Sequence, residues 1–308
     1  MTRWTAADIP DQTGRTALIT GANSGLGRRS AQALAERGAR VLIACRNAEK
    51  GRAALAEIAR TATTAPELVE LDLTDLASIH RAADAVRDRT DGLDVLMNNA
   101  GVMATPRRST SDGFELQIGT NHLGHAALTW LLLPALRPGA RVVTVSSLAH
   151  RFGGLDVDDL NFTRRRYQPL LAYSQSKLAN LLFALELDRA AKRAGRDLIS
   201  VAAHPGMAMT ELTGNSSRLR AMPDAVHDVI GLGTRLVTQP AERGALPQLY
   251  AATARGVRGG DYFGPSGIGE LRGHPSRARL SKAARDAGTA GRLWAVTAEH
   301  TGVAPDWP

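Results

Sequence analysis

A tyrosine and a lysine four residues apart form the strongest chemical signal in the sequence. Tyr173 and Lys177 lie within Tyr-Ser-Gln-Ser-Lys, and on a helix this spacing places both side chains on one face. A cation near a phenol favours phenolate and should lower the tyrosine pKa from about 10, so that Tyr173 can exchange protons near neutral pH. With four tyrosines and four lysines in 308 residues, chance predicts roughly 0.05 such pairs.

Two polar positions on other predicted elements could complete a site around this pair. Ser146 and Ser147 follow a predicted strand over residues 141–145, and a hydroxyl there could hydrogen-bond the carbonyl oxygen of a substrate. Asn121 falls inside a long predicted helix. Because asparagine is a poor helix former, Asn121 marks either a kink or a polar site.

A glycine-rich segment predicts a phosphate-binding turn. Thr-Gly-Ala-Asn-Ser-Gly-Leu-Gly occupies residues 20–27, between a predicted strand and a predicted helix. Glycines let the backbone turn sharply and approach a pyrophosphate, which then meets the amides and dipole of the helix N-terminus. The spacing G-x-x-x-G-x-G differs from the common dinucleotide pattern, and a plain helix start is also rich in glycine. The strand–turn–helix context favours a dinucleotide held by Gly21, Asn23, Ser24, Gly25, Leu26 and Gly27.

The end of the second predicted strand indicates which dinucleotide is bound. An NAD enzyme usually carries Asp or Glu there to bind the ribose 2′-hydroxyl. Residues 44–47 are Ala-Cys-Arg-Asn and contain no carboxylate, whereas the Arg46 guanidinium could hold a 2′-phosphate with a bidentate fork. We therefore predict NADP, with NAD less favoured. The alternative is that Arg46 is one of many solvated arginines.

The ends of the third and fourth predicted strands supply further polar groups. Leu-Asp-Leu over residues 71–73 could bind adenine through a side chain and a neighbouring amide, and Asn-Asn-Ala-Gly over 98–101 could tie backbone amides together in the crevice. A surface turn would also contain asparagine and glycine. The residues expected on the cofactor side are Asp72, Leu73, Asn99, Ala100 and Gly101.

The elements that carry these residues alternate between strands and helices. Predicted strands cover residues 16–20, 40–44, 68–71, 93–97, 141–145 and 198–202, and predicted helices cover 25–37, 48–60, 76–89, 112–136 and 172–194. This alternation predicts an α/β fold with a doubly wound parallel sheet of Rossmann type. Six strands give the order 3-2-1-4-5-6, which a seventh extends to 3-2-1-4-5-6-7. With no linker in the pattern, we expect one NADP-binding domain over residues 1–308, with substrate-site insertions at about 148–171 and 207–236.

Composition limits the classes of function. The chain carries a formal charge of +8, and only four of its 38 basic residues are lysines. An arginine-rich solvated surface explains this, with a phosphate-bearing ligand or a nucleic-acid surface as alternatives. Aromatic residues make up 4% and no recognition motif accompanies them, which argues against nucleic acid. No apolar run suits a membrane anchor or a signal peptide, so we expect a cytoplasmic protein.

Metal and disulfide chemistry are not indicated. Cys45 is the single cysteine, which excludes an internal disulfide framework. His122, His125 and His204 could be imagined as a cluster, but no pattern such as H-E-x-x-H accompanies them, so we predict no metal.

Taken in order, these motifs resemble the short-chain dehydrogenase/reductase family over about residues 14–300. The motifs are T-G-A-N-S-G-L-G, N-N-A-G, Asn121, V-S-S, Y-S-Q-S-K and H-P-G. V-L-I-A-C-R-N, N-N-A-G-V-M and S-K-L-A-N are similar to its retinol-dehydrogenase-like branch, which also carries an insertion between serine and tyrosine. The light-dependent protochlorophyllide reductases share much of this pattern of motifs, but they would require cysteines near the substrate. The single cysteine, Cys45, lies on the predicted cofactor side, which argues against that group.

The resemblance implies a catalytic tetrad of Asn121, Ser147, Tyr173 and Lys177. Tyr173 would donate a proton to the carbonyl oxygen, held by Ser147, while NADPH delivers a hydride to carbon. Lys177 would bind the nicotinamide ribose and lower the Tyr173 pKa, and Asn121 would hold a water in the proton relay. Tyr173 and Lys177 would thus also contact the cofactor, together with Pro205, Gly206 and Thr210.

The sequence thus predicts an NADP(H)-dependent oxidoreductase that acts on a small carbonyl or alcohol substrate. Apolar residues in the two predicted insertions suggest that this substrate is a lipophilic aldehyde, ketone or alcohol. These residues are Phe152, Tyr167, Leu170, Met207, Met209 and Leu212. The alternative is a non-catalytic NADP-binding regulator or sensor of the same fold, against which the complete tetrad argues. Since family members commonly pair through their long fourth and fifth helices, a homo-oligomer is a further expectation.

Overall fold

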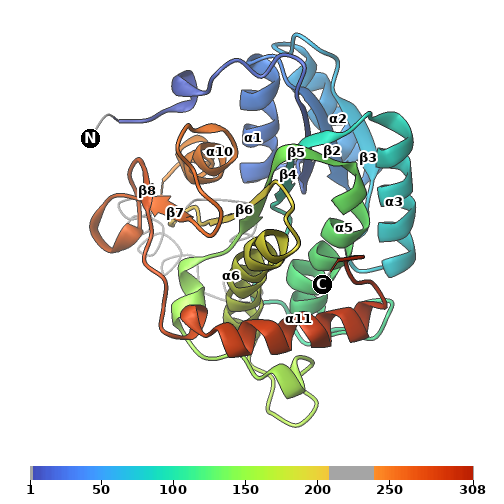
Figure 1. The fold of residues 1–308 in the computed structure, drawn as a ribbon, viewed down its shortest axis with the longest axis vertical. Coiled ribbons are helices and arrows are strands. Elements are labelled where there is room, and N and C mark those ends of the chain that lie inside the picture. The colour runs from blue at the N-terminus through green and yellow to red at the C-terminus, as the bar shows by residue number, and fades with distance from the viewer. Residues whose placement is uncertain (1–2, 208–238, 308) are drawn as a thin grey trace, which may run out of the picture.

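The computed structural model describes residues 3–207 and 239–307, whose strands join one sheet of eight. The strand order is β3-β2-β1-β4-β5-β6-β7-β8, with β1 to β7 parallel and β8 antiparallel to β7 (Figure 1). The strands are β1 Thr16–Thr20, β2 Arg40–Cys45, β3 Glu67–Glu70, β4 Leu93–Asn98, β5 Leu136–Val145, β6 Leu198–Ala203, β7 Tyr262–Pro265 and β8 Pro275–Arg277. The predicted order 3-2-1-4-5-6-7 is confirmed, and β8 extends it by a strand too short to show alternation in the sequence.

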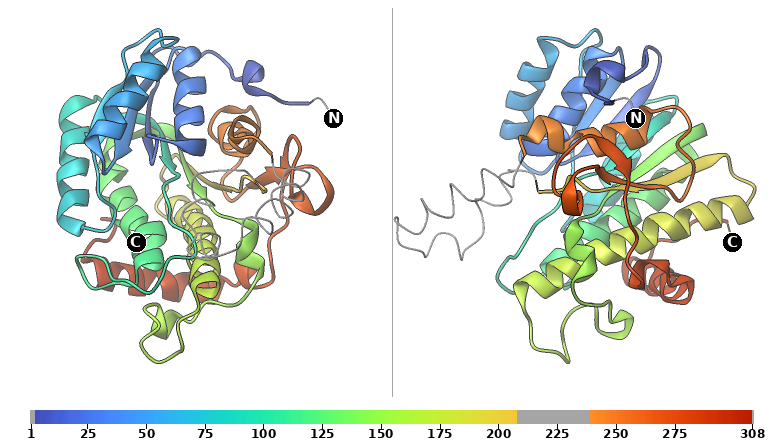
Figure 2. Two further views of the ribbon diagram at one scale, coloured as in Figure 1. Left: turned by 180° about the vertical axis from the view of Figure 1, so that it is seen from behind. Right: turned by 90° about the vertical axis from the view of Figure 1, so that its left-hand side faces the viewer.

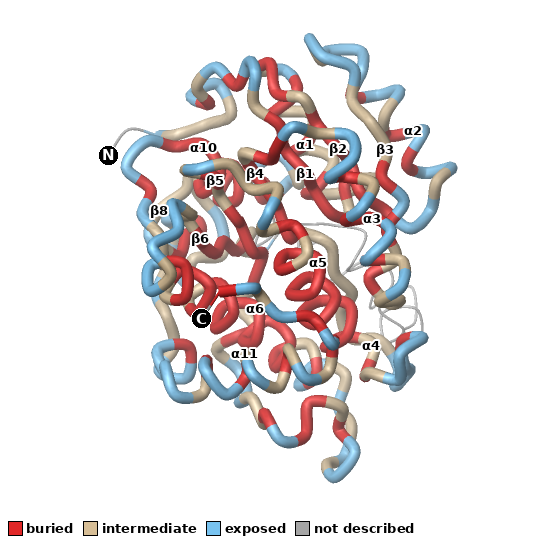
Figure 3. The backbone as a smooth tube through the Cα atoms, turned by 45° about the vertical axis from the view of Figure 1, so that its right-hand side comes forward, coloured by how far each residue is buried: buried red, intermediate tan, exposed pale blue. Residues whose placement is uncertain are grey.

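Helices cover both faces of the sheet (Figures 1 and 2). One face is covered by α1 Gly25–Glu36, α2 Ala48–Ala59, α9 Ala241–Gly244 and α10 Leu246–Thr253. The other is covered by α3 Leu76–Arg89, α5 Gly124–Leu132 and α6 Pro169–Arg193, with α11 Ala287–Thr301 packed against α6. Successive strand residues point to opposite faces, so Leu18 enters one hydrophobic cluster and Ile19 the other. Strands buried on both sides therefore form the centre of the molecule (Figure 3).

The predicted helix over residues 112–136 begins later than expected and is not uniform. It consists of α4 Leu116–Ile118, a π-helical turn Gly119–Leu123, and α5. The helix begins at Leu116 because the Glu115 carboxylate accepts hydrogen bonds from the amides of Gln117 (2.9 Å) and Ile118 (2.8 Å), as a helix N-cap does. Asn121 lies at the centre of the π-helical turn, so the expected interruption of the helix is observed.

The first predicted insertion contains two short 3-10 helices, η4 Leu148–Arg151 and η5 Val157–Asp159, before α6 begins. It is organised around the buried Asp159 carboxylate, which accepts hydrogen bonds from Thr163 and Arg165. Of the second predicted insertion at 207–236, only its first residue, Met207, lies among the described residues.

No helix within residues 3–207 and 239–307 combines the length and the hydropathy needed to cross a lipid bilayer.

Two buried histidines tie the π-helical turn and α5 to other elements. The His122 Nε2 lies 2.9 Å from the Thr297 hydroxyl of α11. The His125 Nε2 lies 2.8 Å from the Thr20 hydroxyl, and its Nδ1 lies 3.0 Å from the Asn121 carbonyl oxygen. Burial lowers the pKa of His122 to about 3 and that of His125 to about 4, because a charged imidazole is poorly solvated in the core.

These histidines should make the fold less stable in mild acid. Their folded pKa values lie below the unfolded value of about 6.5, so the unfolded chain binds more protons as the pH falls below 6.5. The expected loss of unfolding free energy between pH 7 and pH 5 is about 2 kcal/mol for each histidine, measured by urea denaturation. His122→Gln should reduce that loss, whereas substitution of the exposed His80 by Gln should not. A free energy of unfolding that is constant from pH 7 to pH 5 would contradict this expectation.

Candidate active site

The glycine-rich turn follows β1 and leaves no room for side chains. Gly21 has a φ of +67°, and a Cβ there would lie 2.9 Å from the Ala100 Cα. A Cβ on Gly27 would lie 2.6 Å from the Gly21 carbonyl oxygen and 2.5 Å from the Asn99 side-chain nitrogen. Beyond this close-packed turn, α1 begins after Ser24, whose side chain makes no capping hydrogen bond. The first backbone amides of α1 remain available to an anion, so the turn suits a dinucleotide phosphate.

The Thr20 hydroxyl joins this turn to the end of β4. It accepts hydrogen bonds from the amides of Asn99 (2.9 Å) and Ala100 (2.9 Å) and also meets the His125 ring. The Asn99 side-chain nitrogen donates to the Thr20 carbonyl oxygen at 2.8 Å. The Asn99 side-chain oxygen accepts from the Gln248 side chain of α10 at 3.2 Å. The asparagine segment thus ties backbone groups together in the crevice, as the sequence predicts.

Arg46 stands at the end of β2 and its side chain is 72% exposed. One guanidinium nitrogen lies 3.9 Å from a carboxylate oxygen of Asp72. The other Asp72 oxygen accepts hydrogen bonds from the Thr74 amide (2.9 Å) and hydroxyl (2.7 Å). Arg46 therefore retains donors for a ligand, whereas the Asp72 carboxylate mainly organises its own turn and Leu73 is buried beside it.

Tyr173 and Lys177 both lie on α6, next to Ser147 at the end of β5. The Lys177 ammonium lies 5.8 Å from the centre of the Tyr173 ring and donates to the Val145 carbonyl oxygen at 3.1 Å. Ser146 donates to the Lys177 carbonyl oxygen at 2.7 Å and so fixes α6 against β5. The Ser147 hydroxyl instead accepts from the Ala149 amide at 3.2 Å and lies close enough to the Tyr173 phenol to lower its pKa. The two serines thus have different partners.

The expected lowering of the Tyr173 pKa is not observed. Burial raises the pKa of the Tyr173 phenol, and the nearby Ser147 hydroxyl offsets only part of that rise. Burial also lowers the pKa of Lys177 to about 8, since both charged forms are disfavoured away from water. Tyr173 therefore carries its proton at neutral pH and can act as an acid.

Asn121 connects the tetrad to the end of β4. Its side-chain oxygen accepts from the Val102 amide at 2.8 Å, and its side-chain nitrogen donates to the Val102 carbonyl oxygen (2.9 Å) and to the Ser176 hydroxyl (2.9 Å). A Cβ on Gly101 would lie 3.1 Å from the Asn121 side-chain oxygen and 3.5 Å from the Lys177 ammonium. The Asn121 side chain is therefore occupied by protein partners, and Gly101 lies between the side chains of Asn121 and Lys177.

Pro205 and Gly206 follow β6, with Gly206 at a φ of +65°. Among the apolar loop residues, Phe152, Leu170 and Met207 are exposed. Tyr167 instead donates through its hydroxyl to the Thr105 carbonyl oxygen at 2.9 Å and so joins the insertion before α6 to the segment that follows β4. Thr210, Met209 and Leu212 lie outside the described residues.

Three residues that the sequence did not assign to the site contact the predicted residues through side-chain hydrogen bonds: Thr20, Ser176 and Gln248. Thr20 and Ser176 lie inside the glycine and tyrosine motifs, whereas no pattern marks Gln248. The i to i+4 spacing of Asn121 and His125 was the available indication that His125 belongs to this region.

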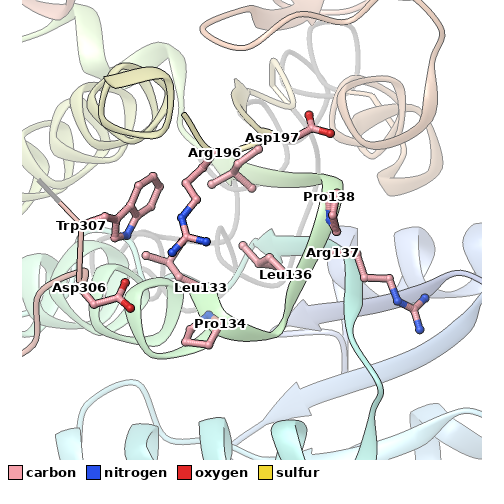
Figure 4. A pocket seen from close by; sticks show the side chains of 10 residues that line it. Leu133, Pro134, Leu136, Arg137, Pro138, Arg196, Asp197, Asp306 and Trp307 are labelled. Atoms are coloured by element: carbon pink, nitrogen blue, oxygen red, sulfur yellow. The ribbon is translucent and has the colours of Figure 1, made fainter. Parts of the chain in front are cut away.

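A pocket of about 360 Å³ lies at the amino ends of the strands, on the side of the sheet opposite to this site (Figure 4). It is bordered by the first residues of β5 and β6, with Arg196 and Trp307 side by side on one wall. It therefore cannot contribute to chemistry at the carboxyl ends of the strands.

Comparison with known proteins agrees with this geometry. A family model described as short chain dehydrogenase matches residues 15–220. Human retinol dehydrogenase 12 is 40% identical over 295 residues, covering 94% of this chain and 87% of that protein. Human retinol dehydrogenase 13 is 40% identical over 302 residues, covering 96% and 86%.

Solved structures show the same fold. A crystal structure of an uncharacterized protein from Mycobacterium paratuberculosis is 46% identical, with a TM-score of 0.81 over 100% of both chains. A complex of RhlG from Pseudomonas aeruginosa with NADP is 25% identical, with a TM-score of 0.63 over 81% of this chain and 94% of that chain.

The family model and the relatives identify an oxidoreductase that acts on CH–OH or C=O groups with a nicotinamide cofactor. The chain belongs to the short-chain dehydrogenase/reductase family and, within it, to the retinol-dehydrogenase-like branch.

The Thr20 hydroxyl should be important for stability. Thr20→Val keeps the shape of the side chain but leaves the amides of Asn99 and Ala100 without their acceptor, which should lower the free energy of unfolding by about 2–4 kcal/mol. Thr16→Val, a control on the same strand whose hydroxyl makes no hydrogen bond with the described residues, should change it by less than about 0.5 kcal/mol. Equal effects of the two substitutions in denaturant titrations would refute this assignment.

Proposed function

We propose that this protein is an NADP(H)-dependent enzyme that interconverts a lipophilic aldehyde or ketone with its alcohol. The observation that carries the proposal is that Tyr173, Ser147 and Lys177 come together at the carboxyl ends of the strands, at the same side of the sheet as a glycine turn in which a Cβ does not fit at Gly21 or Gly27. That convergence brings a proton donor to the end of the crevice where a nicotinamide would lie.

Tyr173 acts as the general acid in the reducing direction. The bound nicotinamide supplies the hydride, with its two electrons, to the carbonyl carbon. The Tyr173 hydroxyl gives its proton to the carbonyl oxygen, so that one hydride and one proton yield the alcohol. Because burial raises the Tyr173 pKa, the phenol is protonated at neutral pH and ready for this step. In oxidation, the same group must first be deprotonated.

The other members of the tetrad position and support this proton transfer. The Ser147 hydroxyl lies next to the Tyr173 phenol, whose pKa it lowers, and holds the substrate oxygen at the same place. Lys177 provides an ammonium 5.8 Å from the Tyr173 ring and binds the nicotinamide ribose. Asn121 fixes the Val102 backbone through its side chain and so positions the segment that follows β4 against the cofactor. Because its side chain is bonded to Val102 and Ser176, we assign it this positioning role.

A bound cofactor would extend along the carboxyl ends of the strands, from β2 to β6. The residues that we propose hold it are Gly21, Asn23, Ser24, Gly25, Leu26, Gly27, Arg46, Asp72, Leu73, Asn99, Ala100, Gly101, Tyr173, Lys177, Pro205, Gly206 and Thr210. NADP is favoured over NAD because the exposed Arg46 guanidinium occupies the position of the usual ribose-binding carboxylate. The NADP complex of the related RhlG protein supports this choice.

A lipophilic substrate is supported by the apolar side chains exposed near the site. Phe152 and Leu170 are 68% and 57% exposed on the segment that follows β5, and Met207 is 40% exposed after β6. Ser147 and Pro205 follow these strands closely. Phe152 and Met207 lie on the loops that continue from them, and Leu170 lies in the first turn of α6, so all three are in the segments that we propose border the substrate. The names of the retinol dehydrogenase relatives point to the same class of substrate.

Tyr173→Phe should abolish turnover while leaving cofactor binding intact. The substitution removes the proton donor and no other group, so kcat should fall at least about a hundredfold, measured as NADPH consumption against a panel of medium- and long-chain aldehydes and ketones. Tight NADPH binding by the wild-type protein without turnover of any panel member would favour a cofactor-binding regulator or sensor. Turnover unchanged by Tyr173→Phe would exclude Tyr173 as the acid.

Arg46→Ala should weaken NADPH binding selectively. Loss of a charge-assisted contact with the 2′-phosphate is expected to raise the NADPH Kd about tenfold to a hundredfold, while the NADH Kd changes less than about twofold. Substitution of the exposed Arg255 by Ala controls for the loss of one positive charge. Equal weakening of both cofactors in fluorescence titrations would remove the assignment of Arg46 to the 2′-phosphate.

A further inference from the structure

Glu270 joins three segments at the edge of the candidate site. One carboxylate oxygen lies 3.0 Å from the His204 Nε2 and 2.6 Å from an Arg151 guanidinium nitrogen. The other oxygen accepts from the Arg279 amide at 3.1 Å. His204 directly follows β6, Arg151 is the last residue of η4, and Glu270 itself lies in the connection between β7 and β8. One carboxylate thus links the loops that follow β5, β6 and β7.

The hydrogen bonds of His204 define its tautomer. Its Nδ1 accepts from the Gly206 amide at 3.2 Å, which requires an unprotonated Nδ1, so Nε2 carries the proton and donates it to Glu270. The ring is buried and packs against the Tyr262 ring, with centroids 5.2 Å apart. A Cβ on Gly264 would lie 1.9 Å from Nε2, so the strand β7 leaves space for the imidazole only because residue 264 is glycine.

The backbone around Gly206 is also held against the Glu270 segment. The Met207 amide donates to the Leu271 carbonyl oxygen at 2.8 Å, and a Cβ on Gly206 would lie 2.3 Å from that oxygen. Glu270 has a φ of +61°, a left-handed conformation that costs a non-glycine residue of order 1 kcal/mol. The contacts of the Glu270 carboxylate with His204, Arg151 and the Arg279 amide must therefore offset the cost of this backbone conformation.

We propose that Glu270 and His204 are positioning residues for the nicotinamide end of the cofactor site. Glu270 fixes His204 as the Nε2–H tautomer, and the His204 Nδ1 in turn orients the Gly206 amide and the Pro205–Gly206 peptide. This inference rests on the proposed function, in which Pro205 and Gly206 contact the cofactor. They belong to its nicotinamide end because β6 pairs with β5, which carries Ser147, whereas Arg46 follows β2 on the far side of β1.

The test compares two ligands that share the adenosine half. NADPH contains both halves of the cofactor, whereas adenosine 2′,5′-bisphosphate lacks the nicotinamide half. Glu270→Gln replaces the carboxylate by an amide that can also donate, so it no longer enforces one His204 tautomer. We expect the NADPH Kd to rise about tenfold and the Kd of adenosine 2′,5′-bisphosphate to stay within about twofold, both measured by calorimetric titration.

Two control variants separate the histidine contact from other roles of Glu270. Arg151→Gln removes the ion pair but leaves the Glu270–His204 hydrogen bond, so the NADPH Kd should change less than about twofold. Glu299→Gln neutralises an exposed carboxylate and should have no effect. If Arg151→Gln weakens NADPH as much as Glu270→Gln does, the ion pair rather than the histidine contact is responsible and the inference is overturned.

The remaining outcomes distinguish this inference from the proposed function. Equal weakening of both ligands in Glu270→Gln would indicate a general structural role and would overturn the inference. Unchanged NADPH binding in Glu270→Gln, with Arg46→Ala still selective for NADPH, would overturn the inference alone. Absence of NADPH binding by the wild-type protein would overturn both.

A measurement on the wild-type protein tests the inference even if Glu270→Gln does not fold. Nitrogen-15 NMR of histidine-labelled protein at pH 7 should show His204 as the neutral Nε2–H tautomer, identified by loss of its signals in His204→Gln. A His204 resonance of the Nδ1–H tautomer, or of the charged imidazolium, would contradict the inference.

Discussion

The hydrogen bonds of the Thr20 hydroxyl form the constraint on which the site depends. β1 and β4 are neighbours in the sheet although two strands and three helices separate them in the chain, and the crevice opens where the strand order reverses. A single hydroxyl there satisfies the amides of Asn99 and Ala100 and contacts His125. The Thr20 hydroxyl therefore connects the glycine turn, the end of β4 and the helical segment that contains Asn121. Their positions relative to the residues of α6 depend on this connection.

Much of this arrangement could be predicted from local sequence. Buried parallel strands are short apolar runs, glycines stand where no Cβ fits, and the spacing of Tyr173 and Lys177 requires only a helix. The sheet order and the grouping of residues at the carboxyl edge follow from these local patterns, because right-handed crossovers restrict the topology. The strand β8 was missed, since three residues at a sheet edge carry no periodic signal.

Features that depend on tertiary packing could not be predicted. The spacing of Tyr173 and Lys177 indicates their proximity but not how far each is desolvated, and burial reverses the expected direction of the tyrosine pKa. Likewise, the His204–Glu270 contact joins residues 66 apart in the chain, and no local pattern marks Glu270 as its partner. The start of α4 depends on the Glu115 carboxylate turning back to cap two amides, a choice that helix periodicity does not reveal.

The two outer strands affect how copies of the chain can associate. β3 has four residues, with Glu67 and Glu70 at its ends, and β8 has three, bounded by Pro275 and Arg277. Short edges that carry charges or proline are poor templates for another strand. Continuation of the sheet from one molecule into the next is therefore disfavoured at both edges, which protects a largely buried parallel sheet from edge-to-edge aggregation and leaves the helical faces as the surfaces suited to self-association.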